Sequence, residues 1–176
     1  MELTQALIRV DTTNDNETAA AEVLVDYLER ATGGVVETEI VCREPRRGNL
    51  VARLPGAAPG APDLALVGHL DVVPADARDW THPPFAAEID DAGYLFGRGA
   101  VDMKNEVAAR AVALAELARS GFRPSGDLLL IAVADEENGA ADVGMHWLLG
   151  ARPELRPAYA VNEGGGQRLE LTDGRA

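Results

Sequence analysis

The order of apolar and polar residues predicts helices at the start of the chain and a sheet after them. Apolar residues at helical spacing follow a run of capping residues at 13–16, and the glycine pair at 33–34 is expected to end this helix. Residues 35–41 alternate between apolar and polar side chains, which is typical of a half-buried strand. Residues 49–54 predict a second strand, and the following segment at 55–62, rich in Gly, Ala and Pro, predicts a surface loop.

Three later runs are almost free of polar residues. Residues 64–67 and 128–133 contain apolar side chains only, and residues 158–161 form a weaker third run. Runs of this kind suit central strands of a parallel sheet that helices cover on both faces. Helices are predicted at 105–119 and 142–149, so strands alternate with helices and the chain is expected to adopt an α/β fold.

A histidine and several acidic residues come directly after these apolar runs. His69 and Asp71 follow the first run. An acidic triplet at 135–137 follows the second, Glu163 follows the third, and Asp102 stands just ahead of the long predicted helix. In open α/β sheets the carboxyl ends of the strands form the edge where ligands bind. Carboxylates gathered there repel one another unless cations neutralise them, so the pattern predicts one divalent metal ion or a pair of them.

Each of these residues also has an interpretation without a metal. His69 could be a hydrogen-bonded histidine at a strand end, although the carboxylate of Asp71 lies within reach and can orient the imidazole through its other nitrogen. Asp102 taken alone fits a helix N-cap better than a ligand. The acidic pair at 136–137 is typical of a solvated turn, and Glu163 before glycines is typical of a loop. Four such signals at one edge, in this order, favour the metal site.

Composition narrows the function classes. The 176 residues include 16 Lys and Arg against 29 Asp and Glu, a net charge of −13 that argues against nucleic acid or an anionic membrane as partner. A single cysteine excludes an internal disulfide, and the N-terminus lacks a signal-peptide pattern. No apolar stretch approaches the roughly 20 residues that span a bilayer. A cytoplasmic protein is expected, and its two serines, Ser120 and Ser125, lie away from the predicted edge, which argues against a serine triad.

Four stretches of the chain carry a family resemblance. They read Gly-His-Leu-Asp-Val-Val-Pro at 68–74, Gly-Arg-Gly-Ala-Val-Asp-Met-Lys at 97–104, Asp-Glu-Glu at 135–137 and Asn-Glu-Gly at 162–164. In this order they resemble the zinc-dependent family of metallopeptidases and deacylases that includes aminoacylase, acetylornithine deacetylase, succinyl-diaminopimelate desuccinylase and glutamate carboxypeptidase. The resemblance implies a three-layer catalytic domain with a central, mostly parallel sheet flanked by helices.

The resemblance also implies a role for each residue of the predicted site. It implies two zinc ions, with cobalt as the alternative, and four ligands to them: His69, Asp102, Glu137 and Glu163. Asp102 would bridge the two ions, and His69 and Glu163 would bind the first of them. The peptide bond between Asp102 and Met103 would be cis. Glu136 would be the general base that takes the proton of the metal-held water, and Asp71 would orient the imidazole.

One departure concerns the length of the chain. The family's second zinc takes a final histidine from a later part of the catalytic domain, whereas this sequence ends at Ala176. In relatives a smaller lid or dimerisation domain lies between the last glutamate ligand and that histidine. The resemblance therefore implies that residues 1–176 are the N-terminal portion of a catalytic domain, truncated before the lid domain, whose full-length form is a homodimer.

The function implied is that of a metal-dependent amidohydrolase that cleaves N-acyl-amino acids or small peptides. Within the family, glutamate at the position of Glu163 is associated with deacylases more than with peptidases, which favours N-acyl-amino acids. Two alternatives stay open. One is a dipeptidase or carboxypeptidase of the same family, and the other is a catalytically silent metal-binding fragment that lacks the last ligand and the lid.

Overall fold

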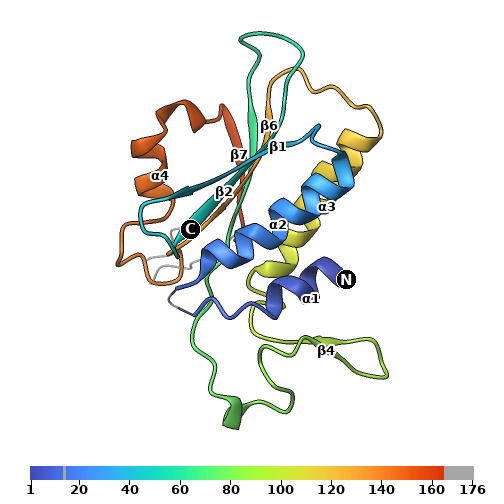
Figure 1. Ribbon diagram of the computed structural model, residues 1–176, viewed down its shortest axis with the longest axis vertical. Helices are drawn as coiled ribbons and strands as arrows, with labels where there is room; N and C mark the ends of the chain where they lie inside the picture. The colour runs from blue at the N-terminus through green and yellow to red at the C-terminus, as the bar shows by residue number, and fades with distance from the viewer. Residues whose placement is uncertain (14, 165–176) are drawn as a thin grey trace, which may run out of the picture.

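A mixed sheet of five strands forms the centre of the protein (Figure 1). The computed structural model describes residues 1–13 and 15–164, so Asn14, one of the predicted capping residues, and residues 165–176 lie outside the described part. The strand order is β1-β2-β6-β3-β7, in which β6, β3 and β7 are parallel and β2 is antiparallel to both β1 and β6. The strands of this sheet are β1 (Glu37–Cys42), β2 (Gly48–Leu54), β3 (Leu64–His69), β6 (Leu128–Val133) and β7 (Tyr159–Val161).

Helices cover both faces of the sheet, which gives the three layers that the resemblance implied. In Figure 1, α1, α2 and α3 lie on one side of the sheet and α4 lies on the other. A separate two-stranded hairpin stands below the sheet in this view. These elements are α1 (Glu2–Ile8), α2 (Glu17–Thr32), α3 (Lys104–Arg119), α4 (Met145–Ala151), β4 (Glu88–Ile89) and β5 (Leu95–Phe96), with single 3₁₀ turns at Ala77–Asp79 and Pro153–Leu155.

The central strand β6 shows why its sequence is apolar without interruption. All six of its residues are buried. Leu130 and its alternate neighbours pack against α1, α2 and α3, whereas Ile131 and its alternate neighbours pack toward α4. Because side chains alternate across a strand, a strand covered on both faces needs an apolar residue at every position. Each fully buried Leu or Ile contributes about 1.5–3 kcal/mol to folding, so this strand anchors both layers.

Two predicted boundaries are wrong by a few residues. The strand predicted at 35–41 begins at Glu37, because the glycine pair at 33–34 adopts left-handed backbone with φ of 61° and 86° before the chain reaches the sheet. The helix predicted at 142–149 is α4, which begins three residues later. Asp142 has a φ of 51° and therefore cannot be helical. None of the helices in the described ranges is long and apolar enough to cross a membrane.

Candidate metal centre

The candidate site forms where the three parallel strands end. β3 ends at His69, which pairs in register with Val133 at the end of β6. The acidic triplet at 135–137 follows β6 directly, and Glu163 lies just beyond β7. Asp102 stands two residues ahead of α3. Four separate elements therefore bring their polar residues to one edge of the sheet, as the sequence pattern predicts.

Three of the predicted ligands form one compact group. His69, Asp102 and Glu163 each offer a ligand atom, and these three atoms all lie within 4.8 Å of one another. Nε2 of His69 is 2.9 Å from Oδ1 of Asp102 and 3.6 Å from Oε1 of Glu163. The imidazole is buried, whereas the Asp102 side chain is 62% exposed, so the group is open to solvent on one side. One imidazole nitrogen and two carboxylate oxygens are donors that suit a catalytic zinc ion with an open position.

The two adjacent glutamates differ in their relation to this group. Oε2 of Glu136 lies 3.7 Å from the same Nε2 of His69, and its side chain is half exposed. Glu137 is not one of the three grouped ligands. Partial burial, followed by the negative charge of Asp102, raises the pKa of Glu137. Glu136 therefore faces the group directly, and Glu137 lies close enough for the negative charge of Asp102 to raise its pKa.

Asp71 lies beside the Nδ1 side of the imidazole with both its backbone and its side chain. The nearest acceptor to Nδ1 of His69 is the backbone carbonyl of Asp71, at 2.9 Å, while its carboxylate is 3.5 Å away. The carboxylate also accepts hydrogen bonds from the backbone N–H groups of Glu136, at 3.2 Å, and Glu137, at 3.0 Å. The oxygen that accepts from Glu136, Oδ1, is the one that lies 3.5 Å from the ring, so this carboxylate faces both the ring and the amides. Asp71 thus links the end of β3 to the loop after β6.

The electrostatics of the group favour an added positive charge. Burial opposes protonation of His69, but the hydrogen bonds and charges of Asp71, together with Asp102, outweigh it and raise the pKa of His69 to about 9. The pKa of Glu163 is raised as well, in this case by burial first and then by the negative charges of Asp102 and Glu136. A proton on the imidazole relieves part of the repulsion among the carboxylates, and a divalent cation would relieve more.

The N-cap interpretation of Asp102 is wrong. The N-cap of α3 is Met103, and no side chain caps this end of the helix. The Asp102–Met103 peptide bond is cis, as the resemblance implies. Asp102 therefore precedes the helix and directs its carboxylate to His69.

The sequence pattern does not single out a buried lysine that lies beside the site. Lys104 is completely buried, and its Nζ donates to the carbonyl of Leu7 in the last turn of α1 and to that of Val10 just after it. Burial lowers the pKa of Lys104 to about 8. Gly99, at φ 86°, leaves room for its stem, since a Cβ there would lie 2.9 Å from Cδ of the lysine. Lysine is usually exposed, so nothing in the pattern marks it as an anchor between α1 and α3.

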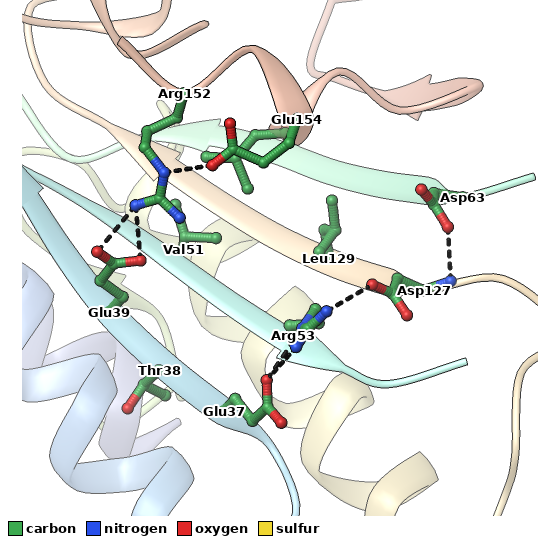
Figure 2. Close-up of a pocket in the computed structure, with 11 residues that line it drawn as sticks. Glu37, Thr38, Glu39, Val51, Arg53, Asp63, Asp127, Leu129, Arg152 and Glu154 are labelled. Atoms are coloured by element: carbon green, nitrogen blue, oxygen red, sulfur yellow. Dashed lines mark hydrogen bonds and ion pairs between the residues drawn. The ribbon is translucent and has the colours of Figure 1, made fainter. Parts of the chain in front are cut away.

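Two cavities differ in their relation to the site. One of about 420 Å³ opens beside Glu137 and is lined by Asp71, Arg47 and the apolar segment at 72–74. The other, of about 370 Å³, lies over β1, β2 and β6, and Figure 2 shows that ion pairs such as Arg53 with Glu37 line it. The first cavity shares residues with the candidate metal centre, and the second is separate from it.

Two sequence relatives carry the name of the same enzyme. The chain is 36% identical over 181 residues to a Staphylococcus epidermidis protein named "Probable succinyl-diaminopimelate desuccinylase", which covers 97% of this chain. It is 40% identical over 144 residues to a succinyl-diaminopimelate desuccinylase of Methylorubrum extorquens, which covers 80% of this chain. The chain spans 43% and 36% of the length of these two relatives, which is less than half of either.

Solved structures show the same fold. An M20 family metallo-carboxypeptidase from Sulfolobus solfataricus superposes with a TM-score of 0.73 at 22% identity, over 98% of this chain and 38% of that chain. A Bacillus subtilis protein described as a dinuclear metal binding peptidase from the M20 family gives a TM-score of 0.63 at 18% identity, over 92% of this chain and 40% of that chain. The mixed sheet with its flanking helices is therefore the fold of these metallopeptidases.

A family match completes the comparison. Residues 65–173 match peptidase family M20/M25/M40. The matched segment begins in β3 and includes all six residues predicted to form the site. Since it covers more than half of the chain, the protein belongs to peptidase family M20/M25/M40.

Proposed function

We propose that this protein hydrolyses amide bonds with the help of a bound divalent metal ion. The observation that carries the proposal is the group formed by His69, Asp102 and Glu163, whose ligand atoms lie within 4.8 Å of one another. The donor set fits zinc, with cobalt as the alternative, and the raised pKa values of His69 and Glu163 indicate a site that favours added positive charge. When bound, the metal would polarise the amide carbonyl and lower the pKa of water.

The residues around this group have the positions that hydrolysis requires. Asp71 holds the Nδ1 side of the His69 ring, which directs Nε2 toward the carboxylates. Glu136 is half exposed beside that nitrogen, so its carboxylate can take a proton from an attacking water and give it to the leaving amine nitrogen. Glu137 would be the ligand of a second ion, with Asp102 shared between the two.

The substrate class we favour is an N-acyl-amino acid with a free carboxylate on the amino-acid part. Two relatives at 36% and 40% identity are named as succinyl-diaminopimelate desuccinylases, and Glu163 occupies the ligand position that the family resemblance associates with deacylases. A dipeptidase or carboxypeptidase activity is the alternative within the family. The homodimer and the cytoplasmic location stay predictions.

The proposal is tested by loading the chain with Zn²⁺ or Co²⁺ and following release of free amine. The substrates are N-succinyl-diaminopimelate, N-acetyl-amino acids and unmodified dipeptides. Because the chain spans less than half of its relatives, the same assay is run on a fusion of the chain to the unmatched remainder of the S. epidermidis relative. We expect hydrolysis of the N-acyl substrates, strongest in the fusion. A fusion that binds metal and cleaves none of them would overturn the proposal.

Metal binding should depend on pH through His69. Its pKa of about 9 means that the imidazole is protonated at neutral pH before a metal arrives. A metal ion needs the unprotonated nitrogen, so each ion bound below pH 9 displaces a proton, and affinity should rise by up to about tenfold per pH unit until that pKa is reached. Calorimetry in buffers of different ionisation enthalpy measures the released proton. Affinity that is constant between neutral pH and the pKa would contradict the prediction.

A further inference from the structure

The start of β2 lies at the same edge of the sheet as the candidate metal centre. β2 is antiparallel to β6, so its first residues stand beside the last residues of β6. The side chain of Asn49 is buried there, and its Oδ1 accepts a hydrogen bond of 3.0 Å from the backbone N–H of Ala134. Its Nδ2 donates to the carbonyl of Val143 at 2.8 Å. The segment from 134 to 143, which carries Glu136 and Glu137, is thus held at both ends by β2.

Arg47, just ahead of β2, joins two buried carboxylates. Its Nε lies 2.9 Å and 2.8 Å from the two carboxylate oxygens of Glu17, the first residue of α2. Its Nη2 lies 3.5 Å from Oδ1 of Asp135. The side chains of Glu17, Arg47 and Asp135 are 0%, 11% and 3% exposed. Buried carboxylates need a partner of opposite charge, and the planar guanidinium can serve two of them at once.

Asp135 is the residue at which the chain leaves β6 for the site. It has a φ of 61°, an uncommon conformation for a residue with a side chain, which persists where surrounding contacts enforce it. Its second carboxylate oxygen accepts from the N–H of Ala141 at 2.9 Å, and its carbonyl accepts from the N–H of Gly139 at 3.0 Å. The loop therefore folds around the Asp135 side chain, and the guanidinium of Arg47 lies on the other side of that carboxylate.

We propose that Arg47, oriented by Glu17, is a positioning residue for the loop that presents Glu136 and Glu137. By fixing Asp135 it determines where the next two backbone N–H groups lie, and these are the groups that donate to Asp71. Its importance for catalysis rests on the proposed function through the two glutamates, whereas the positioning itself does not require metal or substrate.

The test compares two double variants of the chain. Glu17→Gln with Arg47→Met removes the cation together with the carboxylate that orients it, so that Glu17 is not left as a buried charge and Asp135 alone loses its partner. The matched control is Glu37→Gln with Arg53→Met, which removes a half-exposed pair on the same sheet, at the other end of β2 (Figure 2). Amide hydrogen exchange is measured by NMR without metal for the residues at 136 and 137. Leu130 in the centre of β6 serves as the internal reference.

We expect the amides at 136 and 137 to exchange about tenfold faster relative to Leu130 in the first variant, the factor that corresponds to one lost hydrogen bond. The control should leave that ratio unchanged. Arg47→Lys keeps the charge but loses the planar guanidinium that contacts both oxygens of Glu17, so it should give an intermediate ratio. This variant serves as the test if the double variant fails to fold. An unchanged ratio in these variants would overturn the inference, as would an equal increase at Leu130.

A metal titration separates this inference from the proposed function. None of the three grouped ligands lies on the loop after β6, and the backbone carbonyl of Asp71, not the loop, holds Nδ1 of His69, so the visible absorption and affinity of the first Co²⁺ bound should stay close to those of the unmodified chain in the Arg47 variants. Faster exchange at 136 and 137 in a protein that hydrolyses no amide would uphold the positioning role and reject the proposed function. Unchanged exchange at 136 and 137 in a protein that hydrolyses amides would uphold the proposed function and reject the positioning role.

Discussion

Replacement of His69 by alanine should abolish tight metal binding by this chain. His69 supplies the only nitrogen of the three-ligand group, and Asp102 and Glu163 would be left as two carboxylates, of which Asp102 is largely exposed. Loss of a group that merely supports a ligand typically weakens metal affinity 10–100-fold, so loss of the ligand itself should exceed about 100-fold. Calorimetry with Zn²⁺ and the absorption of bound Co²⁺ measure the effect.

The same experiment distinguishes two unequal metal sites. Among the described residues, the second site has only Asp102 and Glu137, which are too few to hold zinc tightly, so Glu137→Ala should barely change the affinity of the first ion. His146→Ala is the matched control, because that histidine is 97% exposed and pairs with Asp142 away from the group. Two equally tight ions in the unmodified chain would contradict this expectation, as would tight binding that survives His69→Ala.

The parts of the fold that could be predicted are those that a short stretch of sequence determines. A strand buried on both faces is apolar at every position, so β6 is visible as an uninterrupted run, and the first four residues of β3 form a shorter one. Residues at the carboxyl ends of parallel strands lie at one edge of a sheet, and that rule alone brings His69 and Glu163 together, although β7 is an exposed edge strand. The alternation in β1 also predicts a strand, but its first residue depends on how the chain leaves α2.

The parts that could not be predicted are contacts between distant residues with ordinary sequence patterns. Glu17 and Arg47 are 30 positions apart and each has the type of side chain that usually faces solvent, yet Glu17 is fully buried against the largely buried Arg47. The sequence predicts that Asp71 orients His69 with its carboxylate, but it does not show that two backbone amides from another strand end also donate to this carboxylate. Spacing along the chain carries no information about either contact.

Replacement of Glu136 by glutamine should lower the rate of amide hydrolysis by about 10²–10⁴-fold, the usual contribution of a general base, while metal content stays nearly unchanged. The reason is positional. Glu136 faces Nε2 of His69 at 3.7 Å but is not one of the three grouped ligands. The glutamine side chain therefore removes a proton acceptor without removing a metal ligand. The rate is followed with the best N-acyl substrate, in the chain or in the longer fusion, whichever is active.

The rate of hydrolysis and the metal content together distinguish a lost base from a lost metal ion. A loss of activity alone could come from a lost metal ion, so metal content is measured on the same samples, and Glu137→Gln should reduce both activity and binding of the second ion. Glu116→Gln on α3 is the matched control, because Glu116 is exposed and pairs only with Arg119 among the described residues. A nearly normal rate of hydrolysis in the Glu136→Gln protein would contradict the assignment of Glu136 as the general base. A fall in activity together with loss of the first metal ion would instead identify Glu136 as a ligand, and the proton would then need another acceptor at this edge of the sheet.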